Sequence, residues 1–329
     1  MQGNVYAFPI TIVSILLLGM WLFFQLDANI ALFLAELYVQ GKPSLLSKSF
    51  HNKTVLIAGA SDGIGAEMAR QLSSKTNSKL VLMARTKSKL EKVQNECERL
   101  AKQSLSGASI SILLGDVTKG EEAMSSLMKK TLIDCKTDHF DILIMSAGRA
   151  YERTIEKTDM ELIRSTFELN VMGAISTVKA FLSHTSSKDS KQIILISSLV
   201  GKMPTALCAG YSASKAAVNL FFDTLRAERA DVRVTTVCPG PVATNIFAAS
   251  AQAMGEALDN DTIKAMEGMM SVERAVTLML AGCVALPVCL FFELWICPQP
   301  LLLFTYMNQF CPGLIKHFAS ARMKNRRKW

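Results

Sequence analysis

The chain has 329 residues, half of them hydrophobic, and carries a formal net charge of +8. This length suits one large α/β domain with added segments. The basic residues are scattered apart from a C-terminal run, which argues against a nucleic-acid partner, because such a binder gathers cations along one groove. Eight cysteines without a C-x-x-C pair, and only four histidines, argue against a metal site.

An uncharged apolar run occupies residues 7–26. As a helix it would rise about 30 Å, the thickness of the hydrocarbon core of a bilayer. No basic residue precedes it and no small-x-small cleavage pattern follows it, so a retained membrane anchor is favoured over a cleaved signal peptide. We therefore predict an anchor segment at 1–26, a connector at 27–51, a folded domain at 52–297 and an apolar, then basic, tail at 298–329.

Strand-like and helix-like segments alternate across the predicted domain. The strand candidates share apolar or β-branched residues with little polar alternation, as in strands buried on both faces. They cover residues 54–58, 79–84, 109–114, 142–146, 192–197, 233–238 and 291–296. An apolar run at 275–292 is interpreted as a core helix to about Val284 followed by the last strand, rather than as a second membrane span, because Pro287 interrupts it. The pattern predicts an α/β fold with a Rossmann-type, doubly wound, seven-stranded parallel sheet.

A glycine-rich loop follows the first predicted strand directly and opens into a helix. It reads Gly59, Ala60, Ser61, Asp62, Gly63, Ile64 and Gly65. Gly59 permits a tight turn, Gly63 lets the backbone approach a pyrophosphate, and Gly65 allows the helix to pack closely on the strand. These features predict a dinucleotide site. A methyltransferase, which also has a Gly-rich loop after its first strand, is the competing interpretation.

The second predicted strand ends next to Arg85, and no acidic residue follows until Glu91. A site for NAD usually has a carboxylate in this region for the ribose 2′-hydroxyl, whereas Arg85 can form charge-assisted bonds to a 2′-phosphate. NADP(H) is therefore the expected cofactor. NAD(H) stays the alternative, because Asp62 adds a negative charge nearby.

Tyr211 and Lys215 are four residues apart, on one face of a predicted helix. A free phenol, with a pKa near 10, is a poor acid–base catalyst at neutral pH, and a cationic neighbour lowers that pKa. The spacing alone is also common on ordinary surface helices. Here, however, Ser198 ends the preceding strand, where a hydroxyl that polarises a carbonyl would belong, and Pro239-Gly240 follows the next strand.

Over residues 52–297 the chain resembles the classical short-chain dehydrogenase/reductase family. The matching motifs are 59–65, Asp116-Val117, Ala147-Gly148, Asn170, Ser198, Tyr211 with Lys215, and Pro239-Gly240. Two positions depart from the family pattern. Ala58 replaces the usual threonine before the glycine loop, and Met145-Ser146 replaces a pair of asparagines.

The resemblance implies a catalytic role for four residues. Tyr211 would protonate the substrate carbonyl oxygen, and Ser198 would orient that oxygen. Lys215 would hold the nicotinamide ribose and lower the pKa of Tyr211, while Asn170 would help to seat a proton-relay water. The purely structural alternatives are a helix cap for Ser198 and a turn for Asn170.

The resemblance also assigns cofactor contacts outside the glycine loop. Asp116 would bind the adenine amino group, next to Val117. Thr244, which follows Pro239-Gly240-Pro241-Val242, would meet the carboxamide, with a plain loop hydroxyl as the alternative.

Within the family the chain is most similar to the membrane-anchored group of dehydrogenase/reductase SDR family member 7, which shares segments like 238–242 and 295–300. The resemblance implies NADPH-dependent reduction of a lipophilic ketone or aldehyde, or the reverse alcohol oxidation, with a steroid, a retinoid or a long-chain lipid carbonyl as the substrate. The alternative is a non-catalytic nucleotide-binding membrane sensor or scaffold, although a sensor needs no proton donor.

Residues 245–271 correspond to the segment that caps the substrate in this family. Its apolar residues are Phe247, Met254, Leu258, Met266, Met269 and Met270. Methionines adapt to irregular apolar shapes, so they suit a lipophilic substrate, or equally helix packing on the core. The apolar part of the tail, 301–318, is expected to lie on the bilayer, with packing against the core as the alternative.

A single-pass protein of the endoplasmic reticulum membrane, in contact with membrane lipid, is expected. Lys42, Lys48 and Lys53 follow the anchor and favour a cytoplasmic domain. Asn52 and Asn260 begin glycosylation acceptor triplets, which would be used only in the lumen. Family members often dimerise, so a homodimer is one expected assembly.

Overall fold

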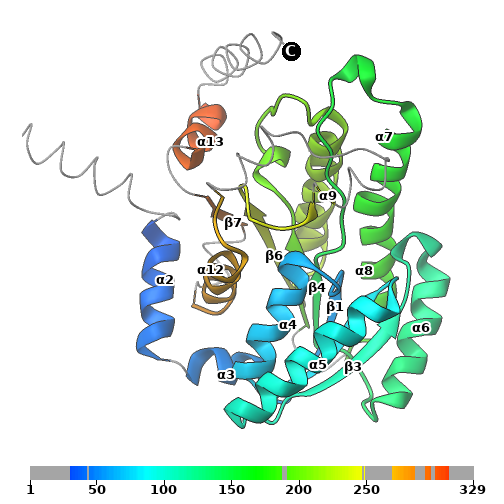
Figure 1. Ribbon diagram of the computed structural model, residues 1–329, viewed down its shortest axis with the longest axis vertical. Coiled ribbons are helices and arrows are strands. Elements are labelled where there is room, and N and C mark those ends of the chain that lie inside the picture. Colours follow the sequence, from blue (N-terminus) through cyan, green and yellow to red (C-terminus); the bar gives the residue numbers. More distant parts are fainter. Residues whose placement is uncertain are drawn as a thin grey trace, which may run out of the picture.

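The computed structural model describes residues 30–42, 44–186, 191–246, 248, 269–285, 293–297 and 301–310. Its centre is a seven-stranded sheet in the order β3-β2-β1-β4-β5-β6-β7, and every neighbouring pair of strands is parallel (Figure 1). The strands are β1 Thr54–Ala58, β2 Lys79–Ala84, β3 Ser109–Leu114, β4 Ile142–Met145, β5 Lys191–Ile196, β6 Val232–Pro239 and β7 Glu293–Ile296. The predicted α/β sheet and its seven strands are therefore confirmed.

Helices cover both faces of the sheet because alternate residues of each inner strand point to opposite sides. On one side, Val55 and Ile57 of β1 join a core built with α4 Gly63–Lys75, α5 Lys87–Ser104 and α12 Val272–Ala285. On the other side, Leu56 and Ala58 join a second core. That core is built with α6 Glu121–Asp134, α8 Gly173–Ser183 and α9 Ala209–Glu228.

The segment between the predicted anchor and the first strand is helical, and it belongs to the first of these cores. It forms α2 Ile30–Gly41 and α3 Ser44–Phe50. Leu32 and Phe50 are buried in the core, and Glu36 is ion-paired with Arg274 of α12. The predicted connector is therefore part of the folded unit (Figure 1).

The second apolar run follows its predicted division, with α12 ending at Ala285 and β7 ending at Ile296. After it comes a helix, α13 Leu301–Phe310, in which Leu302 and Thr305 are fully buried. Residues 301–310 thus pack against the core through Leu302 and Thr305, the alternative given for this part of the tail, and contact of the tail with a bilayer stays a prediction. The rest of the tail and the predicted anchor at 7–26 lie outside the described residues. Within the described part of the chain, no helix has the length and apolar character needed to span a membrane.

Candidate active site

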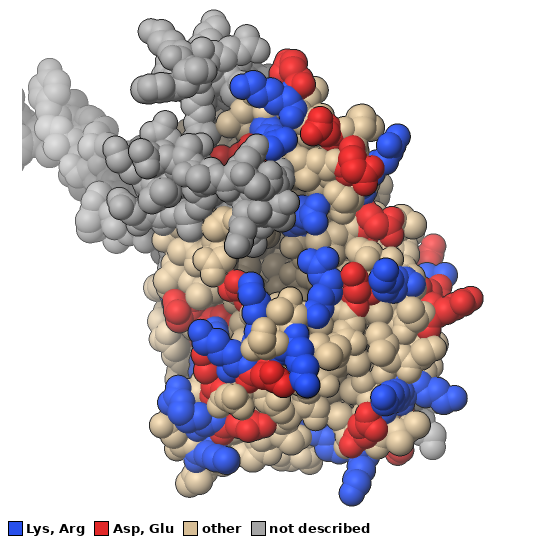
Figure 2. Space-filling view, turned by 45° about the vertical axis from the view of Figure 1, so that its right-hand side comes forward, with Lys and Arg blue, Asp and Glu red and all other residues tan. Residues whose placement is uncertain are grey.

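A cavity of about 910 Å³ opens at the carboxyl ends of the strands. The sheet order reverses direction at β1, which pairs with β2 on one side and β4 on the other, and ligands of open α/β sheets bind at such a point. Figure 2 shows the hollow with Lys and Arg side chains around it. Seventeen of the nineteen predicted site residues line the cavity, and Gly65 and Asn170 support it from behind.

The glycine loop forms the floor of the cavity between β1 and α4. Gly59 has a φ of +88°, and a Cβ at that position would lie 2.5 Å from the backbone nitrogen of Ala147. A Cβ on Gly65 would collide with the carbonyl group of Gly59, so the start of α4 packs directly on the turn. Only glycine fits at either position, which agrees with the predicted tight turn and close packing. The backbone is thereby left open for a pyrophosphate.

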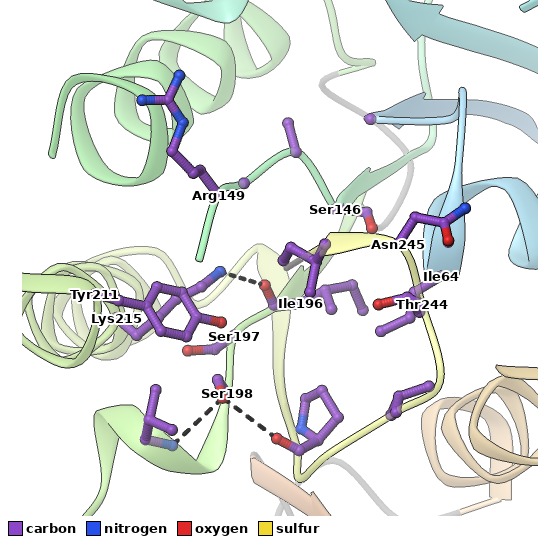
Figure 3. Close-up of a pocket in the computed structure, with 18 of the residues that line it drawn as sticks. Ile64, Ser146, Arg149, Ile196, Ser197, Ser198, Tyr211, Lys215, Thr244 and Asn245 are labelled. Carbon is purple, nitrogen blue, oxygen red and sulfur yellow. Dashed lines mark hydrogen bonds between the residues drawn. The ribbon is translucent and has the colours of Figure 1, made fainter. Parts of the chain in front are cut away.

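Asp62 is occupied by two contacts inside the protein. Its carboxylate accepts a hydrogen bond from the backbone nitrogen of Gly63, at 2.7 Å, and caps α4. It also accepts from the side-chain nitrogen of Asn245, at 3.3 Å. Asp62 therefore ties the glycine loop to the segment that follows β6. Figure 3 shows Asn245 beside Ile64 and Thr244.

One end of the cavity is lined by polar groups that suit an adenosine. Arg85 and Lys89 both face it, next to the end of β2. Asp116 accepts hydrogen bonds from the backbone nitrogen and the hydroxyl of Thr118, at 3.0 and 2.9 Å. Although burial favours the neutral form, these bonds and the nearby Arg85 and Lys119 together lower the pKa of Asp116. Val117, which follows it, also lines the cavity. Lys89, in the first turn of α5, was not predicted.

Asn170 holds the loop after β4 rather than facing the cavity. It lies in a short π-helix, Glu168–Met172, and is 2% exposed. Its side chain accepts a hydrogen bond from the backbone nitrogen of Arg149, at 2.8 Å, and donates to the Arg149 carbonyl, at 2.9 Å, and to Ser214, at 3.0 Å. These bonds join α9 to the loop that carries Ala147 and Gly148, both of which line the cavity.

Ser198 and Tyr211 meet at the other end of the cavity (Figure 3). The Ser198 hydroxyl accepts a hydrogen bond from the backbone nitrogen of Val200, at 3.3 Å, so this residue caps a short 3-10 helix and also faces the cavity. Burial raises the pKa of Tyr211 above its ordinary value, and a hydrogen bond with Ser198 opposes that shift. The predicted lowering of this pKa by Lys215 is therefore wrong, because desolvation of the phenolate outweighs other influences.

Lys215 is buried in the same wall, one helical turn after Tyr211. Its ammonium group donates a hydrogen bond to the carbonyl oxygen of Ile196, at 3.0 Å (Figure 3). Burial lowers the pKa of Lys215 to about 8. The bond to Ile196 holds the side chain in the cavity wall, between the end of β5 and Gly148 in the loop after β4.

The last residue of β6 and the segment after it complete the cofactor side of the cavity. Its lining residues are Pro239, Gly240, Pro241, Val242, Thr244, Asn245 and Ile246. The backbone is held in place on both sides, since Gly240 donates to the Ile296 carbonyl at 2.8 Å and Ala243 donates to the Met270 carbonyl at 2.9 Å.

An apolar wall extends the cavity beyond Ser198 and Tyr211. It includes Val200, Met203, Ala206, Ile246, Met269, Leu301 and Phe304. Met269 belongs to the predicted substrate cap, whereas Phe247, Met254, Leu258 and Met266 lie outside the described residues. Leu301 and Phe304 come from α13 and were not predicted. No local pattern could have identified them, because their place in the wall depends on how α13 packs.

Three comparisons place this arrangement among known proteins. A family model described as short chain dehydrogenase matches residues 53–255. Human dehydrogenase/reductase SDR family member 7 is 32% identical over 305 residues, which is 91% of this chain and 84% of the human protein. Member 7B of Mus musculus is 32% identical over 222 residues, which is 66% of this chain and 67% of that protein.

A solved structure with the same fold is an alcohol dehydrogenase from Thermococcus sibiricus complexed with 5-hydroxy-NADP. It is 25% identical, with a TM-score of 0.61 over 75% of this chain and 97% of that chain. A dehydrogenase/reductase from Sinorhizobium meliloti has a TM-score of 0.64 at 21% identity, over 77% of this chain and 96% of that chain.

Proposed function

Because this chain belongs to the short-chain dehydrogenase/reductase family and is an oxidoreductase of the member 7 group, we propose that it reduces a lipophilic ketone or aldehyde with NADPH, and oxidises the corresponding alcohol in reverse. The observation that supports this most is the meeting of Ser198, Tyr211 and Lys215 in the cavity that the glycine loop opens onto. A methyltransferase is set aside by the family match. A sensor without activity would not need these three side chains.

The described residues fit a nicotinamide dinucleotide along the length of the cavity. The basic pair Arg85 and Lys89 lies at the adenosine end, the glycine loop lies in the middle with Thr244 beside Gly63, and Lys215 lies at the end that carries Tyr211. When bound, the reduced nicotinamide supplies the hydride that the carbonyl carbon accepts.

The protein's own part in reduction is to supply and guide a proton. The raised pKa of Tyr211 keeps its phenol protonated at neutral pH, as a proton donor must be. Tyr211 gives this proton to the substrate oxygen as negative charge develops there. Ser198 donates a second hydrogen bond to the same oxygen, which stabilises that charge. Lys215 holds the ribose and restores the charge balance around the tyrosine after proton transfer.

A direct test is to purify the full-length protein in detergent and to follow NADPH oxidation with steroid, retinoid and aliphatic carbonyls. Turnover of apolar carbonyls, with little turnover of short polar ones, is the expected result. If none of these carbonyls is reduced, and none of the matching alcohols is oxidised, the proposed function is wrong.

The preference for NADPH over NADH rests on Arg85, with Lys89 beside it. We expect Arg85→Glu to lower the ratio of kcat/KM for NADPH to that for NADH by about 10- to 100-fold, since a hydrogen bond to a charged group contributes roughly 1.5–3 kcal/mol. Steady-state kinetics with both cofactors measures this ratio. Arg99→Glu, on the exposed side of α5, is the matched control and should leave the ratio unchanged. An unchanged ratio in Arg85→Glu would remove the basis for NADPH selectivity.

The apolar wall supports a lipophilic substrate. Met203, Met269 and Phe304 line the same cavity as Ser198 and Tyr211. Methionine and aromatic side chains of this kind suit a steroid, retinoid or long-chain skeleton.

Attachment to a membrane, with the endoplasmic reticulum as its location, also belongs to this proposal. It is supported by the uncharged run at 7–26 and by α2, which exposes Leu34, Leu37 and Tyr38 just after it. The lysines after the run favour a cytoplasmic catalytic domain. A mobility shift on glycosidase treatment would instead place Asn52 in the lumen.

A charge within the apolar run tests the attachment. We expect the full-length protein to resist extraction by alkaline carbonate, and Leu17→Arg to release most of it, because an arginine at the centre of a span costs about 2.5–3.5 kcal/mol. Leu105→Arg, at an exposed leucine far from the run, is the control. Equal extraction of the two variants would argue against an anchor at 7–26.

A further inference from the structure

Helix α13 lies beyond the segment that the family model matches, yet it reaches the active site. Leu301 and Phe304 line the cavity, whereas Leu302 and Thr305 are fully buried against the core. Residues three apart share one face of a helix, so α13 turns one edge to the cavity and the next edge to the core. The helix therefore forms a wall of the cavity.

Contacts with two other segments hold α13 at this place. The ring of Tyr306 lies 4.8 Å from that of Trp295, measured between centroids, at the end of β7. Asn308 donates a hydrogen bond to the carbonyl oxygen of Lys202, at 3.0 Å, and Lys202 forms an ion pair with Glu293 at 2.6 Å. These contacts hold α13 against both strand β7 and the loop after Ser198.

The contacts of α13 also reach the wall of the cavity. The hydroxyl of Thr305 contacts the sulfur of Met203 at 3.3 Å, and Met203 lines the cavity together with Leu301 and Phe304. Ser198 is only five residues before Met203 in the chain. The loop that begins at Ser198 and helix α13 therefore together form an apolar surface in the cavity that would bind the substrate oxygen at Ser198.

We propose that α13 determines substrate specificity, with Leu301 and Phe304 contacting the apolar body of the substrate away from its carbonyl. This rests on the proposed function and refines it. The enzyme then favours carbonyls with an apolar chain or ring system long enough to reach α13, and discriminates against short ones. Asn308 is a positioning residue that keeps the helix against the loop.

The test uses full-length protein and a series of methyl ketones from short to long alkyl chains. The unsubstituted protein should show kcat/KM rising with chain length. In Phe304→Ala, the ratio of kcat/KM for the longest ketone to that for the shortest should fall about 10-fold, which is the usual effect of losing an apolar contact. The fall should come mainly from a higher KM for the longest ketone. Met307→Ala, on the same helix but outside the cavity lining, is the control and should keep the ratio.

Phe304→Leu is a control for loss of folding, because leucine keeps an apolar side chain at this position. It should lower the ratio by less than Phe304→Ala does. A ratio that is the same in Phe304→Ala, Met307→Ala and the unsubstituted protein would overturn the proposal while leaving carbonyl reduction intact. Binding gives a second readout without turnover. With Tyr211→Phe as background and NADPH present, the long ketone should raise the melting temperature less when Phe304 is also replaced by Ala. An equal rise would overturn the proposal as well.

Discussion

Replacing Tyr211 by Phe is expected to lower kcat for carbonyl reduction by about 10²- to 10⁴-fold, the range typical of a lost general acid. The substitution removes only the hydroxyl that meets Ser198, and the ring keeps its place in the wall of the cavity. NADPH binding should be retained, because the glycine loop and Lys215 are unchanged. Initial rates with the best carbonyl substrate, together with a fluorescence titration of NADPH, measure the two effects separately.

Tyr38→Phe is a suitable control for this substitution, since Tyr38 lies on the exposed side of α2, far from the catalytic wall in the chain, and should keep full activity. If Tyr211→Phe retains more than about a tenth of the rate, proton donation by Tyr211 is not needed, and the proposed mechanism fails. Loss of both activity and NADPH binding would instead indicate a disturbed cavity, and the variant's melting temperature would reveal that.

Replacing Lys215 by Met is expected to abolish measurable reduction and, at the same time, to stabilise the protein near neutral pH. The ammonium group is buried, and its pKa falls to about 8 from its ordinary value of 10.5. The native protein therefore binds a proton at this site less readily than the unfolded chain does. Methionine has a similar length and carries no charge, so it removes this penalty.

The pH dependence of this gain follows from proton binding. Between about pH 8 and 10.5 the unfolded chain carries more protons at this lysine than the native protein, so the free energy of unfolding rises with pH. Below pH 8 the full penalty is present. The stability gain of Lys215→Met should thus be largest below pH 8 and disappear towards pH 10.5.

Thermal denaturation of both proteins from pH 6 to pH 10, without added cofactor, measures this difference. Lys129→Met, at an exposed surface position, is the control. The difference in stability between this variant and the unsubstituted protein should stay the same from pH 6 to pH 10. A Lys215→Met protein that is less stable than the unsubstituted chain at pH 7 would show that the bond to Ile196 contributes more than burial costs.

Residues 30–50, which form α2 and α3, show the limit of local patterns most clearly. The sequence of α2 and α3 carries no strong periodic signal, and their role emerged only from the packing of Leu32 and Phe50 in the core and from the Glu36–Arg274 ion pair. The apolar character of residues 301–310 likewise suits either a bilayer or a core, and only the burial of Leu302 and Thr305 shows that they pack on the core.

The amino-acid sequence alone determined the strands, the glycine loop and the placement of Tyr211 and Lys215 one turn apart on a helix, because each depends on residues close together in the chain. A buried parallel strand is recognisable from its own five or six residues, and Gly59 and Gly65 are required by the turn that they form. The tertiary structure alone decided the direction of the Tyr211 pKa shift, the supporting place of Asn170 and the part of α13 in the cavity. Desolvation and cavity shape arise from segments far apart in sequence, so no single segment contains that information.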